Sequence, residues 1–216
     1  MLLVEDAAEA LGGTFYGKKL GTLGKVGIFS FYGNKTITTG EGGMVVTDSE
    51  SVSESVRLLR GQGQSKSRRY WHIVVGYNYR MTELQAAIGR TQLTKLPGLL
   101  STRQVAAALY RWKLGSAAQF QQVPVGGVHG NWGMAVLFRD SEQAQAVATL
   151  LAVHEIETRP VFPPIHTMPM YSDGRARHPA ARDLHERGLV LPLHPSLKPQ
   201  EIDAICNLVL KVVRHG

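Results

Sequence analysis

Residues 29–44 read FSFYGNKTITTGEGGM, and this stretch decides the interpretation of the fold. An apolar, β-type run over Val26–Phe31 leads directly to Lys35, which glycines and threonines then follow. A single lysine beside glycines is most often a solvated surface residue. The stretch therefore has to be interpreted together with the sequence on either side of it.

The start of the chain supplies a second strand, predicted over Leu2–Val4, which ends at two acids. Pyridoxal phosphate needs an amine for a Schiff base, an acid that faces its ring nitrogen, and hydrogen-bond donors for its phosphate. A strand that ends in an acid, together with a strand that leads to a lysine, is a pattern that could bind this cofactor. Lys35 can supply the amine, Asp6 the acid and Ser30 a phosphate ligand. The glycines of residues 40–43 let the backbone pass close to a ring.

Each of these residues also has a simpler interpretation. Asp6 and Glu9 are equally suited to the N-terminus of a short helix predicted over Ala7–Leu11, where negative charge is favourable. Ser30 could be an ordinary strand hydroxyl. Spacing alone leaves both interpretations open.

Composition limits the class of protein. The 216 residues are 44% hydrophobic and 19% charged, which is typical of a globular chain with a real core. No apolar run reaches the roughly 20 residues of a membrane helix, and Met1–Val4 meets acids too soon for a signal peptide. Because Cys206 is the only cysteine, an internal disulfide and a cysteine metal cluster are excluded, and no metal site is predicted. We expect a cytoplasmic protein without a membrane partner.

The net charge of +7 has two explanations. It could attract nucleic acid, or it could attract a small anionic substrate such as a nucleotide. The only dense basic stretch, Lys66–His72, is short, and no known nucleic-acid module surrounds it. We therefore expect no nucleic-acid partner.

Hydrophobic periodicity predicts an α/β protein in two parts, with a boundary near residues 95–115. A hairpin is predicted around Gly17. In the second half, a strand at Trp132–Phe138, a helix to about Val153 and a closing helix at Pro199–Val213 are expected. The helices expected in the first half end near Arg60, near Leu96 before Pro97, and, after that proline, near Trp112.

Two longer stretches of the sequence resemble a known protein family. VEDAAEALGGTFYGKKLGTLGKVGIFSFYGNKTITTGEGGMVVTD and then GYNYRMTELQAAIGRTQL closely resemble the DegT/DnrJ/EryC1/StrS family of pyridoxal-phosphate sugar aminotransferases. The match is dense over residues 3–93. It implies a fold-type I structure, with residues 1–100 as the C-terminal part of the three-layer αβα large domain and residues 101–216 as a small α+β C-terminal domain.

The resemblance also implies roles for residues of the first half. Lys35 matches the lysine that forms a Schiff base with the cofactor and moves the proton. Asp6 matches the acid at the ring nitrogen, Glu9 lies beside the phenolic oxygen, and Ser30 is a phosphate ligand. Asn78 matches an asparagine that reaches the cofactor phosphate of a neighbouring subunit, which implies a homodimer with shared active sites. A turn-forming asparagine before a helix is the simpler alternative for Asn78.

The second half matches less densely. Arg159 and His166, in ETRPVFPPIH, resemble a loop near the sugar-nucleotide pocket, and a structural proline-rich loop is an equally good interpretation. Trp132 and Trp112 are most simply core or surface residues.

The implied reaction moves an amino group from glutamate to C4 of a nucleotide-linked 4-keto-6-deoxy sugar, of the perosamine type used in surface polysaccharides. Sugar dehydration is an alternative within the family, but that route replaces the lysine with histidine, and Lys35 is present. Since the family's first strands, its Gly-Thr phosphate loop and its ring-covering aromatic precede the matched part, we expect a C-terminal fragment that is poorly soluble alone. An inactive remnant that binds only a partner subunit is the second alternative.

Overall fold

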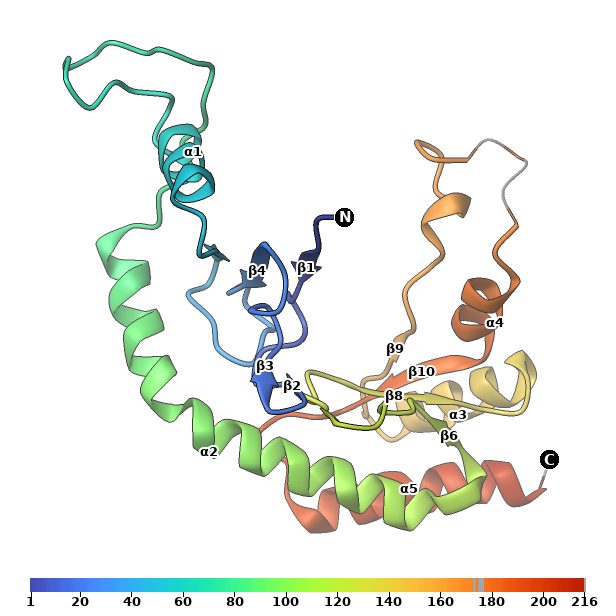
Figure 1. Cartoon of the computed structure of the whole chain (residues 1–216). Coiled ribbons are helices and arrows are strands. Elements are labelled where there is room, and N and C mark those ends of the chain that lie inside the picture. The colour runs from blue at the N-terminus through green and yellow to red at the C-terminus, as the bar shows by residue number, and fades with distance from the viewer. Residues whose placement is uncertain (173, 175–176, 216) are drawn as a thin grey trace. The chain divides into compact units, whose positions relative to one another are not determined.

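A computed structural model describes residues 1–172, 174 and 177–215 (Figure 1). These residues form two compact units. The first contains Met1–Leu100 together with Val123–Trp132, and the second contains Ser101–Gln122 and the described residues from Gly133 onward. A short segment from the second half of the sequence therefore belongs to the first unit.

The first unit contains a three-stranded sheet in the order β1-β4-β5. Its strands are β1 (Val4–Asp6), β4 (Val26–Ser30) and β5 (Gly43–Val46). β1 and β4 are parallel, with Asp6 opposite Ile28, and β4 and β5 are antiparallel. Strand β1 lies two residues later than predicted, and it includes the two acids.

A second sheet of the first unit has the order β3-β2-β7, with β2 at Thr14–Phe15, β3 at Lys18–Lys19 and β7 at Gly127–Val128. The hairpin predicted around Gly17 is confirmed. Both turn residues, Tyr16 and Gly17, have positive φ angles, 46° and 76°, as the tight hairpin turn requires. Because β7 pairs with β2, it holds the 123–132 segment in this unit.

The helix predicted over Ala7–Leu11 is wrong. The structure has successive turns instead, in which the Ala10 amide donates to the Ala7 carbonyl at 3.0 Å and the Gly13 amide to the Ala10 carbonyl at 2.9 Å. Gly12 has a φ of 87°, which ends any helical course after too few residues for a stable nucleus.

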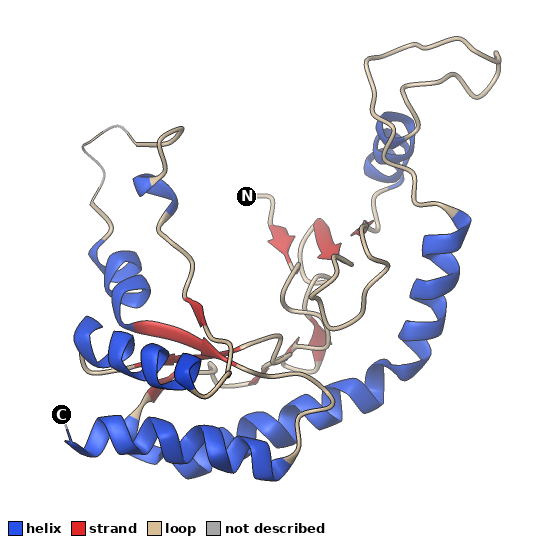
Figure 2. Cartoon of the chain, turned by 180° about the vertical axis from the view of Figure 1, so that it is seen from behind, coloured by secondary structure: helices blue, strands red, loops and turns tan. Residues whose placement is uncertain are grey.

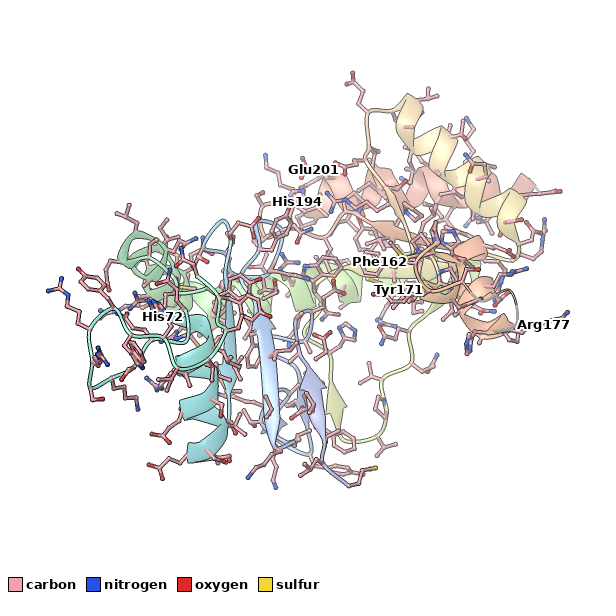
Figure 3. All side chains as sticks on the ribbon, turned by 90° about the horizontal axis from the view of Figure 1, so that it is seen from above. His72, Phe162, Tyr171, Arg177, His194 and Glu201 are labelled. Atoms are coloured by element: carbon pink, nitrogen blue, oxygen red, sulfur yellow. The ribbon has the colours of Figure 1, made fainter. Side chains whose placement is uncertain are left out.

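Two helices follow β5, namely α1 (Glu50–Arg60) and α2 (Glu83–Leu114). Thr82 caps α2. The Gln85 amide donates to Thr82 Oγ1 at 3.2 Å, and Gln85 Oε1 accepts from the Thr82 amide at 2.9 Å. Pro97 lies inside α2, so the two helices expected on either side of it form one. Between α1 and α2 runs a loop that carries His72, marked in Figure 3.

The second unit has an antiparallel sheet in the order β6-β8-β10-β9 (Figure 2). Asp140 is the N-cap of helix α3, because its carboxylate accepts from the Gln143 amide at 2.8 Å. The strands are β6 (Gln119–Phe120), β8 (Met134–Leu137), β9 (Arg159–Pro160) and β10 (Gly188–Leu191). The helices are η1 (Gly115–Ala117), α3 (Ser141–Val153), η2 (Ile165–Thr167), α4 (Pro179–Arg187) and α5 (Pro199–His215).

The core of this unit gathers around Tyr110 of α2, which is fully buried and donates its hydroxyl to the Pro192 carbonyl at 3.0 Å. The last turns of α2 run beside α5 (Figures 1 and 2). An ion pair between Lys113 and Asp203 joins the two helices. Cys206 is buried in this core. The described part is therefore a mixed α/β structure, and it contains no helix long and apolar enough to cross a membrane.

Candidate active site

The candidate site lies in the first unit, at the edge where β1 and β4 end. Because the two strands are parallel and Asp6 is opposite Ile28, the carboxyl end of β1 and the chain leaving β4 at Ser30 meet at one edge of the sheet. Ligands of α/β proteins commonly bind outside this edge. The strands thus bring Asp6 and Ser30 to the place where a cofactor would be expected.

The loop after β4 is held from within. The Phe31 carbonyl accepts from the Thr39 amide and from Thr38 Oγ1, both at 2.9 Å, and the Lys35 amide donates to the Tyr32 carbonyl at 3.0 Å. Thr39 and its neighbour Ile37 are buried. The loop is therefore a closed structure that fixes the backbone at Lys35, and not a free surface excursion.

The side chain of Lys35 is only 13% exposed, so its solvated surface interpretation is wrong. Lys35 Nζ lies 2.9 Å from Glu9 Oε1, and it lies over the Trp132 ring, 4.6 Å from the centroid. The Trp132 indole N–H donates to the Asn34 carbonyl at 3.0 Å. Residues from two distant stretches of sequence, Glu9 and Trp132, therefore flank the amine of Lys35.

Asp6 and Ser30 make local hydrogen bonds. Asp6 is exposed, and its Oδ1 accepts from the Ala8 amide at 3.1 Å. Ser30 Oγ accepts from the Tyr32 amide at 3.3 Å. An exposed carboxylate and a strand-end hydroxyl at this edge are both able to turn toward a ligand.

Asn78 lies in the same unit, in the loop between α1 and α2. It is exposed, and it forms an isolated β-bridge with Gly61 at the end of α1. On either side of it the Gln62 amide donates to the Tyr77 carbonyl at 2.9 Å and the Tyr79 amide to the Arg60 carbonyl at 3.0 Å. The backbone at Asn78 is therefore fixed, while its side chain faces solvent.

Arg159 and His166 belong to the second unit. Arg159 is exposed, and its Nε lies 3.1 Å from Glu157 Oε1. The ring of His166, in η2, meets the ring of His178 edge-on, with the centroids 4.8 Å apart. Phe162 and Tyr171 of the same loop, marked in Figure 3, are exposed. Within their own unit Arg159 therefore lies on the edge strand β9, and His166 lies in η2, in a segment that also carries exposed aromatic side chains.

Sequence reasoning missed two residues. Trp132 was interpreted as core or surface, although it touches Lys35. Glu5 had no assigned role, although its carboxylate accepts the amides of Gly21 at 2.8 Å and of Leu23 and Gly24 at 2.6 Å. Partial burial alone would raise the pKa of Glu5, but these three hydrogen bonds outweigh it and lower the pKa below its ordinary value. For Glu5, the only signal in the sequence was its position at the end of a predicted strand.

Comparison with known proteins identifies the family. Residues 1–210 match the DegT/DnrJ/EryC1/StrS aminotransferase family. The chain belongs to this family. It is 44% identical to the GDP-perosamine synthase of Escherichia coli O157:H7 over 97% of its own length and 57% of the relative's, and 39% identical to that of Vibrio cholerae over 97% and 58%.

A solved structure of a putative sugar aminotransferase has a similar fold. The putative sugar aminotransferase Spr1654 of Streptococcus pneumoniae, in its PLP form, superposes with a TM-score of 0.91 at 25% identity, over 99% of this chain and 58% of that one. The expected aminotransferase fold is therefore confirmed in its general class. The chain spans somewhat over half the length of the proteins it matches.

The residues present fit the cofactor that the family implies. Asp6 and Ser30 offer a carboxylate and a hydroxyl at one sheet edge, and Lys35 offers an amine in the loop that follows Ser30. A Cβ built on Gly40 would meet nothing within 4 Å, so the loop leaves open space beside its backbone. Among the residues that the structure describes, no group of three or more histidine, cysteine or acidic side chains could hold a metal ion.

Proposed function

We propose that this chain acts as a pyridoxal-phosphate-dependent aminotransferase that moves an amino group from glutamate to C4 of a nucleotide-linked 4-keto-6-deoxy sugar. The product would be a perosamine-type amino sugar for a surface polysaccharide. The observation that carries the proposal is the pairing of Lys35 with Glu9 beside the ends of β1 and β4. The name GDP-perosamine synthase, carried by relatives 44% and 39% identical to this chain, supports the sugar class.

In this proposal Lys35 handles the protons. When bound, pyridoxal phosphate supplies an aldehyde that accepts amines and a ring that takes up the electron pair of a broken C–H bond. Lys35 Nζ would move the proton from the α-carbon of glutamate to C4′ of the cofactor, and in the second half from C4′ to C4 of the sugar. Asp6 would hold the proton on the ring nitrogen. Glu9, which pairs with Lys35, would lie beside the phenolic oxygen.

Phosphate binding falls to two residues. Ser30 Oγ, at the end of β4, would donate to a phosphate oxygen of the cofactor in the same subunit. Asn78, which is exposed, would donate to the cofactor phosphate of a second copy. The chain would then work as a homodimer whose active sites are shared, and neither copy would have a complete phosphate site alone.

The nucleotide sugar would be recognised by Arg159 and His166. A guanidinium binds phosphate oxygens well, and Arg159 is exposed on the edge strand β9. The net charge of +7 favours an anionic substrate and an anionic cofactor.

The test is covalent attachment of the cofactor. The chain is incubated with pyridoxal phosphate and reduced with borohydride, and the modified lysine is located by peptide mass spectrometry. We expect attachment at Lys35 in the wild type, none at this position in Lys35→Ala, and no loss in Lys18→Ala, which changes an exposed lysine of β3.

The outcomes separate the alternatives. If the folded wild-type chain shows no attachment at Lys35, the proposal is wrong for this chain, and the inactive, partner-binding alternative is favoured. If attachment occurs, nitrogen-15 glutamate and a nucleotide-linked 4-keto-6-deoxy sugar decide the reaction. Labelled amino sugar with 2-oxoglutarate supports transamination, whereas a deoxygenated sugar without label indicates dehydration.

A further inference from the structure

Trp132 has no assigned role in the proposed function, yet it makes two contacts at the lysine. Lys35 Nζ lies 4.6 Å from the centroid of its ring, within the distance at which an ammonium is attracted to an indole face. Glu9 Oε1 meets the same nitrogen at 2.9 Å. The amine of Lys35 is therefore held between a carboxylate and an aromatic ring.

The second contact acts on the backbone. The Trp132 indole N–H donates to the carbonyl oxygen of Asn34, the residue before Lys35, at 3.0 Å. One side chain thus fixes both the peptide that precedes Lys35 and the end of the lysine side chain. A residue that only filled space would need neither contact.

Close backbone packing before Trp132 places this residue beside Lys35. Strand β7 pairs Val128 with Thr14. Gly130 is buried, and a Cβ built on it would lie 2.7 Å from the Leu11 carbonyl oxygen, so only glycine allows this approach. Asn131 then turns the chain with a φ of 51°, and its amide donates to His129 Nδ1 at 2.7 Å. The turn that carries Trp132 is thereby packed against residues 10–13, which directly follow Glu9.

We infer that Trp132 is a positioning residue that confines the amine of Lys35 beside Glu9. For its consequence in cofactor chemistry the inference rests on the proposed function, since a confined amine would meet the cofactor aldehyde in one orientation. The confinement itself is a property of the chain and can be measured without any cofactor.

The experiment is competitive labelling of the lysines of the cofactor-free chain with acetic anhydride, followed by peptide mass spectrometry. The rate at Lys35 is divided by the rate at Lys18 in the same sample. We expect Trp132→Leu to raise this ratio about three- to tenfold, because both the ring face and the N–H donor are lost. Trp132→Phe keeps a ring face and should raise the ratio by a smaller factor, of about two.

The matched control is Trp112→Leu. Trp112 is exposed, and Lys113 lies over its ring at 4.8 Å, so the control removes the same kind of contact in the second unit. The ratio for Lys35 should not change in this variant. Circular dichroism checks that each variant is folded.

Equal Lys35 ratios in the wild type and in folded Trp132→Leu would overturn the inference. If Trp132→Leu loses its fold, Trp132→Phe decides, and an unchanged ratio there overturns the inference equally. Failure of the proposed function would appear in a different experiment, as a lack of pyridoxal phosphate attachment to Lys35 in the wild type. That failure would not change the result of the acetic anhydride labelling.

Discussion

Replacement of Glu5 by Gln tests how the loop after β3 is held. One carboxylate oxygen accepts the Gly21 amide, and the other accepts the amides of Leu23 and Gly24. A glutamine of the same shape keeps one acceptor oxygen. If that oxygen stays with Leu23 and Gly24, the new NH2 group faces the Gly21 amide, and two donors oppose each other.

The cost follows from the three hydrogen bonds. The bond from Leu23 is exposed, so water can replace it, whereas the bonds from Gly21 and Gly24 are partly buried. A hydrogen bond to a charged group contributes about 1.5–3 kcal/mol in general, and solvent exposure reduces this value, so we expect Glu5→Gln to lower the free energy of unfolding by about 1–2 kcal/mol at neutral pH.

The sign of the pH dependence is fixed by the lowered pKa of Glu5. The carboxylate form is favoured in the folded chain, so its contribution is complete above the unfolded-state pKa of about 4.3 and is lost as the pH falls through the folded-state pKa. Below that point wild-type Glu5 carries a proton and resembles glutamine. The difference between wild type and Glu5→Gln should therefore shrink with acidity.

The assay is urea unfolding followed by circular dichroism, at several values between about pH 7 and about pH 3. Amide hydrogen exchange of Gly21 and Gly24 gives a local reading, and both amides should exchange faster in the variant. Glu41→Gln is the control, because this exposed carboxylate accepts no hydrogen bond that the structure records. A cost that is the same at every pH, or no larger than that of Glu41→Gln, would refute the reasoning.

Two further predictions concern the core of the second unit. Tyr110→Phe removes the hydroxyl that donates to the Pro192 carbonyl and should lower the free energy of unfolding by about 1 kcal/mol in urea; no measurable change would mean that the bond contributes nothing. Burial raises the pKa of the Cys206 thiol to about 11, so iodoacetamide should label the folded chain very slowly at mildly alkaline pH and rapidly once urea is added. Rapid labelling of the folded chain would contradict this packing.

Features that depend on neighbouring residues could be predicted from the sequence. The hairpin follows from the requirement for positive φ at Gly17, and the starts of α2 and α3 follow from Thr82 and Asp140, whose side chains reach amides within one turn. Pro97 was expected to separate two helices, yet α2 continues through it. Pro97 is exposed, so the carbonyl that loses its hydrogen bond there can be solvated.

Features that depend on contacts between distant stretches could not be predicted. Nothing local to Trp132 indicates that β7 will pair with β2 and bring it to Lys35. The resemblance to a family supplies the roles proposed for Lys35 and Asp6, and the structure adds that the side chains of Glu9 and Trp132 meet Lys35. Residues outside the quoted motifs, such as Trp132, can be found only from three-dimensional contacts.

The segment EDAAE shows how one short stretch distributes three carboxylates, and why the failed helix prediction matters. Successive residues of a strand point to opposite faces, so Glu5 and Asp6 of β1 separate, and Glu5 serves the 21–24 loop while Asp6 stays at the open edge. In a helix, Glu9 would lie one turn from Asp6 on the same face, and two like charges would meet there. The turns that replace the helix instead carry Glu9 to Lys35 at 2.9 Å. The turns, which end at Gly12 and Gly13, therefore help to place Glu9 beside Lys35.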